Sequence, residues 1–251
     1  MFGETLDRPT EYFRPFPNAK EVFGAQSKEH ANYLLPLASV ALSRLNRRWG
    51  GWVHFVLPIE PYDGCVGQST KRYHTYLCRE NWIGFRINRR SCYQLAAPFR
   101  YFLMADLDER DDVRLTKRAR SELETLYAST REAFANREAH YREAGALHPE
   151  HVRRRKGRYP ESSRSALVRD IRGHPGWGNW VTSNGVPLAK RGFTNADGEQ
   201  ETDCIPLAED GSEFTFVGWV PAYVYAPGRG CNVYLFYHRR QRLALTTFDW
   251  S

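Results

Sequence analysis

Three short segments near the C-terminus, each rich in β-branched and aromatic residues, constrain the fold of this chain more than any other feature. They are Glu213–Val220 (EFTFVGWV), Cys231–His238 (CNVYLFYH) and Arg242–Trp250 (RLALTTFDW). The turn-forming stretches PGRG and HRRQR separate them, so consecutive segments can pair as neighbouring antiparallel strands. The last 79 residues therefore predict a compact, aromatic-rich antiparallel sheet.

A helix is predicted close to the N-terminus. The opening 25 residues, rich in proline and aromatic residues, are expected to form an extended arm. After this arm, Ser27 can cap a helix, and Arg47 and Arg48 complement the dipole at its C-terminal end. Pro36 lies inside this helix and is expected to kink it or divide it in two. Its apolar stripe consists of Ala31, Leu34, Leu35, Ala38, Leu42 and Leu45.

Strand-like runs follow this helix. They lie at Trp52–Leu57, Arg72–Leu77 and Trp82–Ile87, and Pro98–Met104 is a further candidate. Their alternation of apolar and polar residues is only partial. This pattern is typical of a sheet that is covered on one face and partly covered on the other.

A long amphipathic helix is predicted from about Asp108 to Ala144. Acidic residues at its start suit a helix N-terminus, and neighbouring Arg and Glu residues on its polar face allow many ion pairs. A second, short helix is predicted to begin at Pro149 and to contain a basic run. The apolar stripe of the long helix consists of Leu115, Ala119, Leu123, Leu126, Thr130, Phe134 and Tyr141.

These elements together predict an α+β fold with antiparallel sheets, packed helices and one long, charged amphipathic helix. We divide the chain into an α+β N-terminal half (residues 1–105), a long helical segment that ends in the basic run (106–158) and an aromatic-rich β region (159–251). The last segment is expected to pack with the first as one domain.

The composition is that of a globular protein, with 41% hydrophobic and 26% charged residues in a chain of 251. No apolar run reaches transmembrane length, and the start MFGETLDRPTEYF lacks the features of a secretory signal. A cytoplasmic protein with no membrane partner is therefore expected. Five cysteines, an odd number without a CxxC pair, are expected to be reduced and mostly buried. They are Cys65, Cys78, Cys92, Cys204 and Cys231.

The net charge of +7 is distributed unevenly. Residues 151–172 contain eight Lys or Arg against two acidic residues, whereas residues 173–251 contain six basic and eight acidic residues. The basic character therefore comes mainly from one segment. A general basic coat, typical of a dedicated DNA-binding protein, is missing from this charge pattern.

Three short motifs follow one another in the C-terminal third: the turn Gly173-His174-Pro175, the strand Phe216–Val220 and the loop and strand Gly228–Tyr237. This succession resembles the second half of the YwqG-like domain of unknown function. Three features depart from the family pattern. His174 stands in the Gly-Tyr slot, Gly218-Trp219 replaces a Gln-containing core, and no Gly-Asp-Gly precedes the last hairpin.

This resemblance covers residues 170–251 and implies a function. Domains of this kind recur among candidate immunity proteins of bacterial toxin systems. The resemblance therefore implies a non-enzymatic protein that neutralises a cognate toxin by direct binding. Because the basic segment favours an acidic surface, we expect a cognate toxin or effector protein to bind through an acidic surface, with nucleic acid disfavoured.

The candidate partner-binding residues lie in two places. The basic run HVRRRKGR brings guanidinium groups close together and could grip an acidic partner, although a solvated helix end or an exposed loop is the simpler explanation. Trp177 and Trp180 lie in the glycine-rich stretch GHPGWGNW, which suggests an exposed loop in which tryptophan can anchor an interface. The basic candidates are Arg153, Arg154, Arg155, Lys156 and Arg158.

Two rival functions remain open. Cys65 lies on a glycine-flanked turn and, with His54 or His74 as a base, could serve a cysteine-dependent hydrolase. The basic segment 151–172 could instead belong to a nucleic-acid-associated module.

No catalytic residue, metal site or other cofactor is predicted. His148 and His151, or Cys65 with His74 and Cys78, lack the tight paired spacing of zinc ligands. Neither GxxxxGK[ST] nor GxGxxG occurs in the chain, so no phosphate-cradling loop is expected.

Overall fold

The computed structural model describes residues 3–61, 64–108, 113–154, 156–195 and 197–250, without the side chains of residues 113–116. The strands are β1 (Glu4–Leu6), β2 (Phe13–Pro15), β3 (Leu34–Ala41), β4 (Trp52–Pro58), β5 (Trp82–Ile87), β6 (Tyr93–Leu95), β7 (Val168–Ile171), β8 (Leu188–Thr194), β9 (Gln200–Pro206), β10 (Thr215–Pro221), β11 (Asn232–His238) and β12 (Leu243–Asp249). The α-helices are α1 (Ala19–Phe23), α2 (Ser27–Ala31), α3 (Leu103–Leu107), α4 (Val113–Ala144) and α5 (Ala222–Tyr225). Short 3₁₀ helices are η1 (Gly24–Gln26), η2 (Leu42–Arg44), η3 (Gln68–Tyr73), η4 (Phe99–Tyr101), η5 (Glu161–Ser163) and η6 (Asn179–Thr182).

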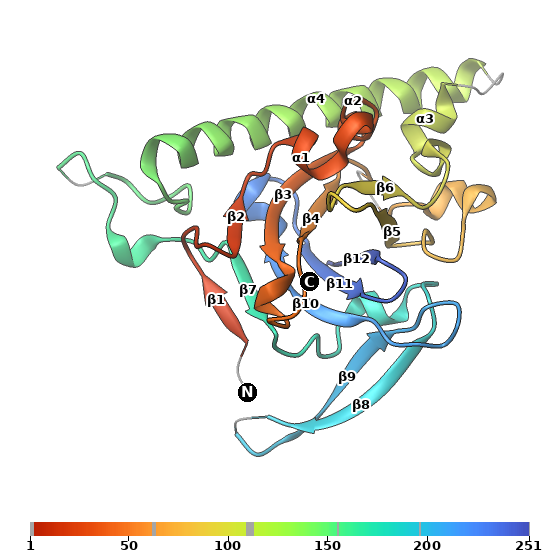
Figure 1. Cartoon of the computed structure of the whole chain (residues 1–251). Helices are drawn as coiled ribbons and strands as arrows, with labels where there is room; N and C mark the ends of the chain where they lie inside the picture. The colour runs from red at the N-terminus through yellow and green to blue at the C-terminus, as the bar shows by residue number, and fades with distance from the viewer. Residues whose placement is uncertain (1–2, 62–63, 109–112, 155, 196, 251) are drawn as a thin grey trace.

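The described strands form three antiparallel sheets (Figure 1). The largest has seven strands in the order β1-β7-β10-β11-β12-β5-β6. A three-stranded sheet, β2-β3-β4, packs against it through the contact of β4 with β11 and β12. The third sheet is the hairpin β8–β9, which lies at the end of the molecule opposite α4 (Figure 1).

Both faces of the large sheet are buried, and the pleat of β11 separates them. Val233 and Leu235 point into the main core between the two sheets, whereas Phe236 points to the opposite face. There it joins a second cluster with Trp82 and Trp180, beside the segment that leads into β8. This arrangement explains why the alternation of apolar and polar residues in the sequence is incomplete.

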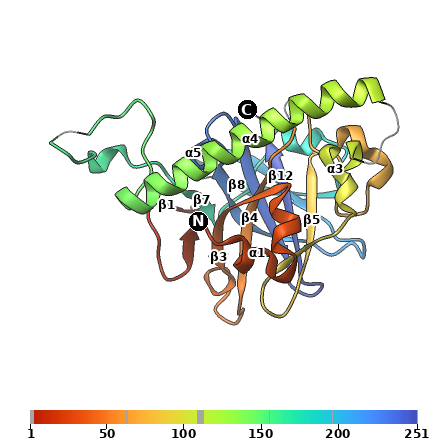
Figure 2. The same cartoon turned by 90° about the horizontal axis from the view of Figure 1, so that it is seen from above.

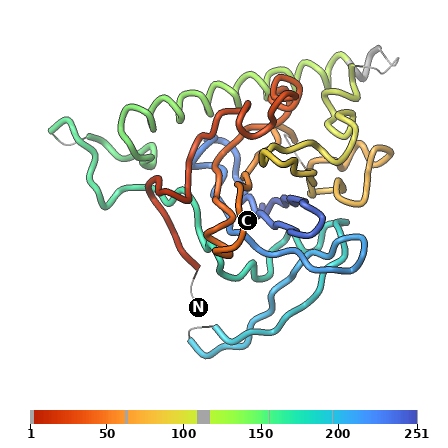
Figure 3. The backbone as a smooth tube through the Cα atoms, in the orientation of Figure 1, coloured from red at the N-terminus to blue at the C-terminus, as the bar shows by residue number. Residues whose placement is uncertain are grey.

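Helix α4 lies across the small sheet and α5 (Figure 2). The ring of Phe16 lies 5.4 Å from the rings of both Phe134 and Tyr141 and 5.1 Å from that of Tyr225. Arg137 donates to the carbonyl of Val224 at 2.9 Å, which fixes the helix to α5. The segment between α4 and β7 then projects from the body of the molecule (Figure 3).

The α+β fold, the long helix and the C-terminal antiparallel sheet are confirmed. Strands β10, β11 and β12 pair consecutively as predicted, and β4 and β5 correspond to two predicted strands. The cysteines are free, and all except the half-buried Cys65 are buried. Strand β5, from the N-terminal half, pairs with β12, so a single sheet contains residues from both ends of the chain.

The predicted helix from Ser27 is wrong. Only α2 and the short 3₁₀ helix η2 are helical there, and between them lies β3, whose eight residues are all buried. An apolar run that is covered on both faces contains the three- and four-residue spacings of a helix without being amphipathic. Pro36 is accommodated at a register shift between β3 and β4, where a missing backbone donor is tolerated.

Other boundaries also differ from prediction. Residues 72–77 and 98–104 form η3, η4 and α3 with connecting turns instead of strands. No helix begins at Pro149, and the described residues of the basic run lie in turns and irregular structure. Residues 200–206, for which no strand was predicted, form β9, which pairs with β8.

Packing at Gly84 provides a test of this fold. A Cβ atom at Gly84 would lie 2.3 Å from the Cβ of Leu77 and 3.0 Å from its carbonyl oxygen. We expect Gly84→Ala to lower the free energy of unfolding by about 1–3 kcal/mol, as overpacking does. Gly230→Ala is the control, because a Cβ there meets no atom within 4 Å. Urea denaturation of both variants measures the difference, and equal stabilities would contradict this packing.

Candidate functional site

The described residues of the basic run lie in the projecting segment between α4 and β7. Arg153, Lys156 and Arg158 are exposed, and Arg155 lies outside the described residues. Arg154 is partly neutralised, because it donates to Glu143 at 2.6 Å and lies over the ring of Tyr159. This segment therefore presents fewer uncompensated charges than its sequence suggests.

The two candidate tryptophans have opposite environments. Trp177 is 55% exposed, and the ammonium of Lys190 lies 4.8 Å from its ring centroid. The prediction of an exposed anchor is wrong for Trp180, whose side chain is fully buried. Its ring packs 5.7 Å from Trp82 and 5.8 Å from Phe236, so it is part of the second core cluster. Glycine-rich flanks mark the loop but do not show which tryptophan turns inward.

A pairing between His174 and Asp203 was missed by sequence reasoning. The Nδ1 atom of His174 lies 2.6 Å from the carboxylate of Asp203, and the imidazole stacks on Phe193 with a centroid distance of 3.8 Å. The second oxygen of Asp203 accepts from the backbone of Gly176. These contacts orient the half-exposed imidazole through its Nδ1 atom and its ring face. The residues lie 29 positions apart, and no local motif links them.

The loop from His174 to Trp177 crosses the edge of the hairpin. The carbonyl of Gly176 accepts from Cys204 of β9, so the loop runs alongside that strand. Phe193 and Lys190, three positions apart in β8, point to opposite faces of the hairpin. His174 and Trp177 consequently lie on different faces.

Cys65 is not activated by its surroundings. Burial, followed by the nearby carboxylate of Glu80, raises the pKa of its thiol. Among the described residues no hydrogen bond joins Cys65 to a histidine. His74 engages the carbonyl of Gly67 at 2.9 Å, and His54 is buried, which lowers its pKa to about 4. The arrangement therefore offers neither a thiolate nor a base positioned beside it.

The reactivity of Cys65 tests this assignment. We expect its alkylation by iodoacetamide to have a pH midpoint above that of free cysteine, because the folded environment raises its pKa. Labelling followed by mass spectrometry measures the profile, and Cys65→Ser identifies the contribution of this site. A midpoint below that of the free amino acid would indicate an activated nucleophile and favour the hydrolase alternative.

A cavity of about 630 Å³ lies between the loop Cys65–Thr70 and α4, with Glu60 in its wall. Glu60 is 3% exposed and accepts hydrogen bonds from the backbone of Leu103 and Met104 and from the hydroxyl of Tyr127. Burial raises the pKa of Glu60 to about 7, although these hydrogen bonds act in the opposite direction. Through these hydrogen bonds, Glu60, which follows β4 in the chain, connects to both α3 and α4.

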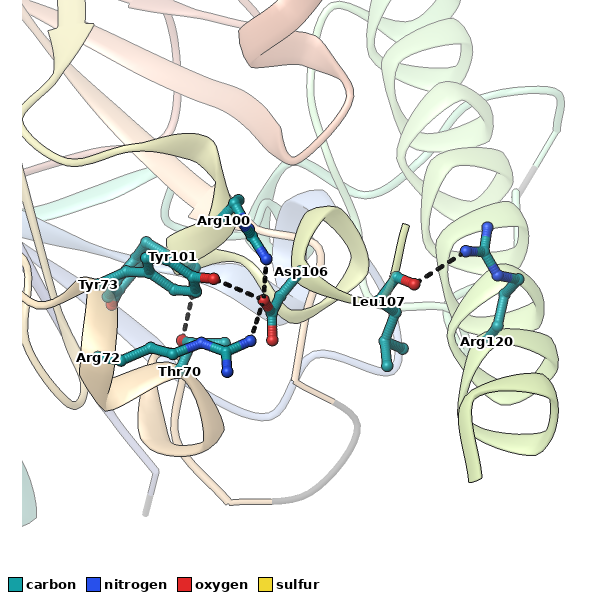
Figure 4. Close-up of polar contacts among 8 residues, drawn as sticks. All are labelled: Thr70, Arg72, Tyr73, Arg100, Tyr101, Asp106, Leu107 and Arg120. Atoms are coloured by element: carbon teal, nitrogen blue, oxygen red, sulfur yellow. Dashed lines mark hydrogen bonds and ion pairs between the residues drawn. The ribbon is translucent and has the colours of Figure 1, made fainter. Parts of the chain in front are cut away.

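A second buried carboxylate, Asp106, braces the same region (Figure 4). Arg72 donates to it at 2.6 Å, the hydroxyl of Tyr73 at 3.0 Å and Arg100 at 3.3 Å. Arg120 of α4 donates to a backbone carbonyl at the end of α3. Residues of η3, η4, α3 and α4 all take part in this network. The network therefore holds these elements together beside the cavity.

The raised pKa of Glu60 predicts a pH-dependent stability. Between pH of about 4.5 and 7, the folded state retains a proton that the unfolded state releases. Stability therefore falls as pH rises through this window, by on the order of 3 kcal/mol. We expect Glu60→Gln to remove this slope in thermal unfolding measured from pH 4 to 8. Glu122→Gln, at an exposed carboxyl of the same cavity, should retain the slope, and a retained slope in Glu60→Gln would contradict the assignment.

Searches against family models, curated proteins and solved structures found no match to this chain. Within the described residues, no group of three or more His, Cys, Asp or Glu side chains is arranged to hold a metal ion. None of the described helices has the length and apolarity needed to cross a membrane.

Proposed function

We propose that this chain is a non-enzymatic binding protein of the bacterial cytoplasm that neutralises a cognate toxin by direct contact, as immunity proteins do. The observation that supports it most directly is Trp177, which is more than half exposed and lies beside Lys190. Exposed tryptophan next to a cation is typical of interface anchors, because it offers a large rigid contact area. The YwqG-like resemblance of residues 170–251 supports the same assignment.

The charge of the exposed residues suits an acidic partner. Arg153 and Arg158 are exposed in the projecting segment, and Lys190 flanks Trp177. Complementary charge accelerates association and disfavours wrong partners. The surroundings of Cys65 favour binding over cysteine-dependent hydrolysis, since burial raises the pKa of the thiol.

The proposal is tested by finding and neutralising a toxin. Affinity capture from the native host identifies the candidate partner, and co-expression of partner and chain then measures rescue of bacterial growth. Rescue together with a stable purified complex supports the proposal. A partner that remains toxic when both proteins are present in equal amounts contradicts it.

Replacement of Trp177 tests the proposed anchor. Trp177→Ala should weaken partner binding by about 2 kcal/mol or more, roughly thirtyfold, because hot-spot aromatic residues contribute on this scale. Tyr223→Ala is the matched control, since Tyr223 is similarly exposed at 54%. Calorimetric titration of the cognate partner measures both affinities, and equal losses would show that Trp177 has no special role.

A further inference from the structure

The loop after β3 and the residue after β7 together form a hollow rich in arginine. Its volume is about 880 Å³, and Arg44, Arg47, Arg48 and Arg172 line it, with Glu11 as the acidic lining residue among those described. Arg172 comes from a segment more than a hundred residues away from the loop. The basic segment 151–172 thus contributes its last arginine to a site that is remote in sequence.

Carboxylates engage these arginines to different degrees. Arg44 donates to Glu4 at 2.7 Å and lies over the ring of Tyr12 at 4.9 Å, so its charge and its planar face are engaged. Arg47 and Arg48 form no ion pair with any described residue, and Arg172 forms none within 4 Å, although its charge helps to lower the pKa of Glu4. Arginines that line one hollow outnumber its carboxylates, so an anionic ligand there would reduce the repulsion between like charges.

The backbone of Arg172 is held in place. Its φ of 63° lies in the left-handed region, which is unusual for a residue other than glycine. Its N–H donates to the carbonyl of Val217 at 3.3 Å, which ties this conformation to the large sheet. A strained conformation that the surrounding structure maintains is common where a side chain must be aimed at a ligand.

A second hollow, of about 340 Å³, adjoins the first and shares Leu45 and Arg172 with it. His174 lines this second hollow together with Asp203 and Glu213. Asp203 engages the Nδ1 atom of His174, and Glu213 accepts from Arg191, so both carboxylates already have a partner within the chain. The two hollows together form one surface, which we call the arginine hollow.

We propose that the arginine hollow receives an acidic peptide segment of the partner, an inference that rests on the proposed function. Guanidinium groups bind carboxylates in a bidentate manner, and two or more Asp or Glu side chains would satisfy Arg47, Arg48 and Arg172. Single-stranded nucleic acid would require open aromatic faces for its bases. In the described lining, one face of Tyr12 is covered by Arg44, and one face of His174 is covered by Phe193.

The first experiment measures binding of a hexaglutamate peptide by fluorescence anisotropy at low and moderate salt. Wild-type protein should bind the peptide in a salt-dependent way, and the combined substitution R47E/R48E/R172E should weaken binding at least about tenfold. K20E/K28E/K117E is the control: it changes net charge equally at exposed lysines of α1, α2 and α4 and should leave affinity within about twofold. R47Q/R48Q leaves Arg172 unchanged and should also weaken binding. This variant shows that the loss does not come from misfolding caused by a substitution at Arg172.

Two outcomes would overturn the inference. One is an equal loss of peptide binding in the lysine control, which would show that only net charge matters. The other is tighter binding of a six-nucleotide oligothymidine through the same arginines, which would assign the hollow to nucleic acid.

The second experiment separates this inference from the proposed function. R47E/R48E/R172E is tested in the co-expression assay beside wild-type protein. If wild-type protein neutralises no partner, the proposed function fails. If wild-type and variant neutralise the partner equally, the proposed function stands and the arginine hollow is excluded as its docking site. Loss of rescue in the variant alone supports the inference.

Discussion

The pairing of β12 with β5 holds this molecule together. Its five residue pairs, from Trp82 with Thr247 to Arg86 with Leu243, join segments about 160 positions apart in one hydrogen-bonded ladder. Because β12 also pairs with β11 along its length, the C-terminal hairpins and the N-terminal half share one sheet. The small sheet then packs against β11 and β12, and the loop after β3 is placed near β7. Each candidate site described above depends on this arrangement.

The predictable part of the fold consists of its local contacts. Strands β10, β11 and β12 follow one another along the chain, so their composition and the turn residues between them were enough to place them, although α5 within the first connection was not predicted. Strand β3 was misread because all its residues are buried, and such a run has the spacing of either element. Its identity is decided by β2 and β4 on its two sides, and a single sequence does not reveal that pairing.

The candidate sites show the same difference between features that are local in sequence and contacts between distant residues. Trp177 and the exposed basic residues were found because they stand out locally in composition. The imidazole of His174 was missed as a site because its partner Asp203 lies 29 positions away in β9, a strand that was not predicted. The burial of Trp180 depends on Trp82, nearly a hundred positions away. The glycine-rich residues beside Trp180 do not reveal that contact.

In the sequence, the positive charge is concentrated in residues 151–172. In the folded chain, several of these charges are paired or lie apart from one another. Arg154 pairs with Glu143, and Arg164 pairs with Glu161. Arg169 lies over the ring of Trp219, whereas Arg172 lines the arginine hollow. Because electrostatic attraction depends on charges that are near one another and uncompensated, proximity in space matters more than a run in sequence. The arginine hollow is therefore a better candidate for anion binding than the basic run of residues 151–158 in the projecting segment.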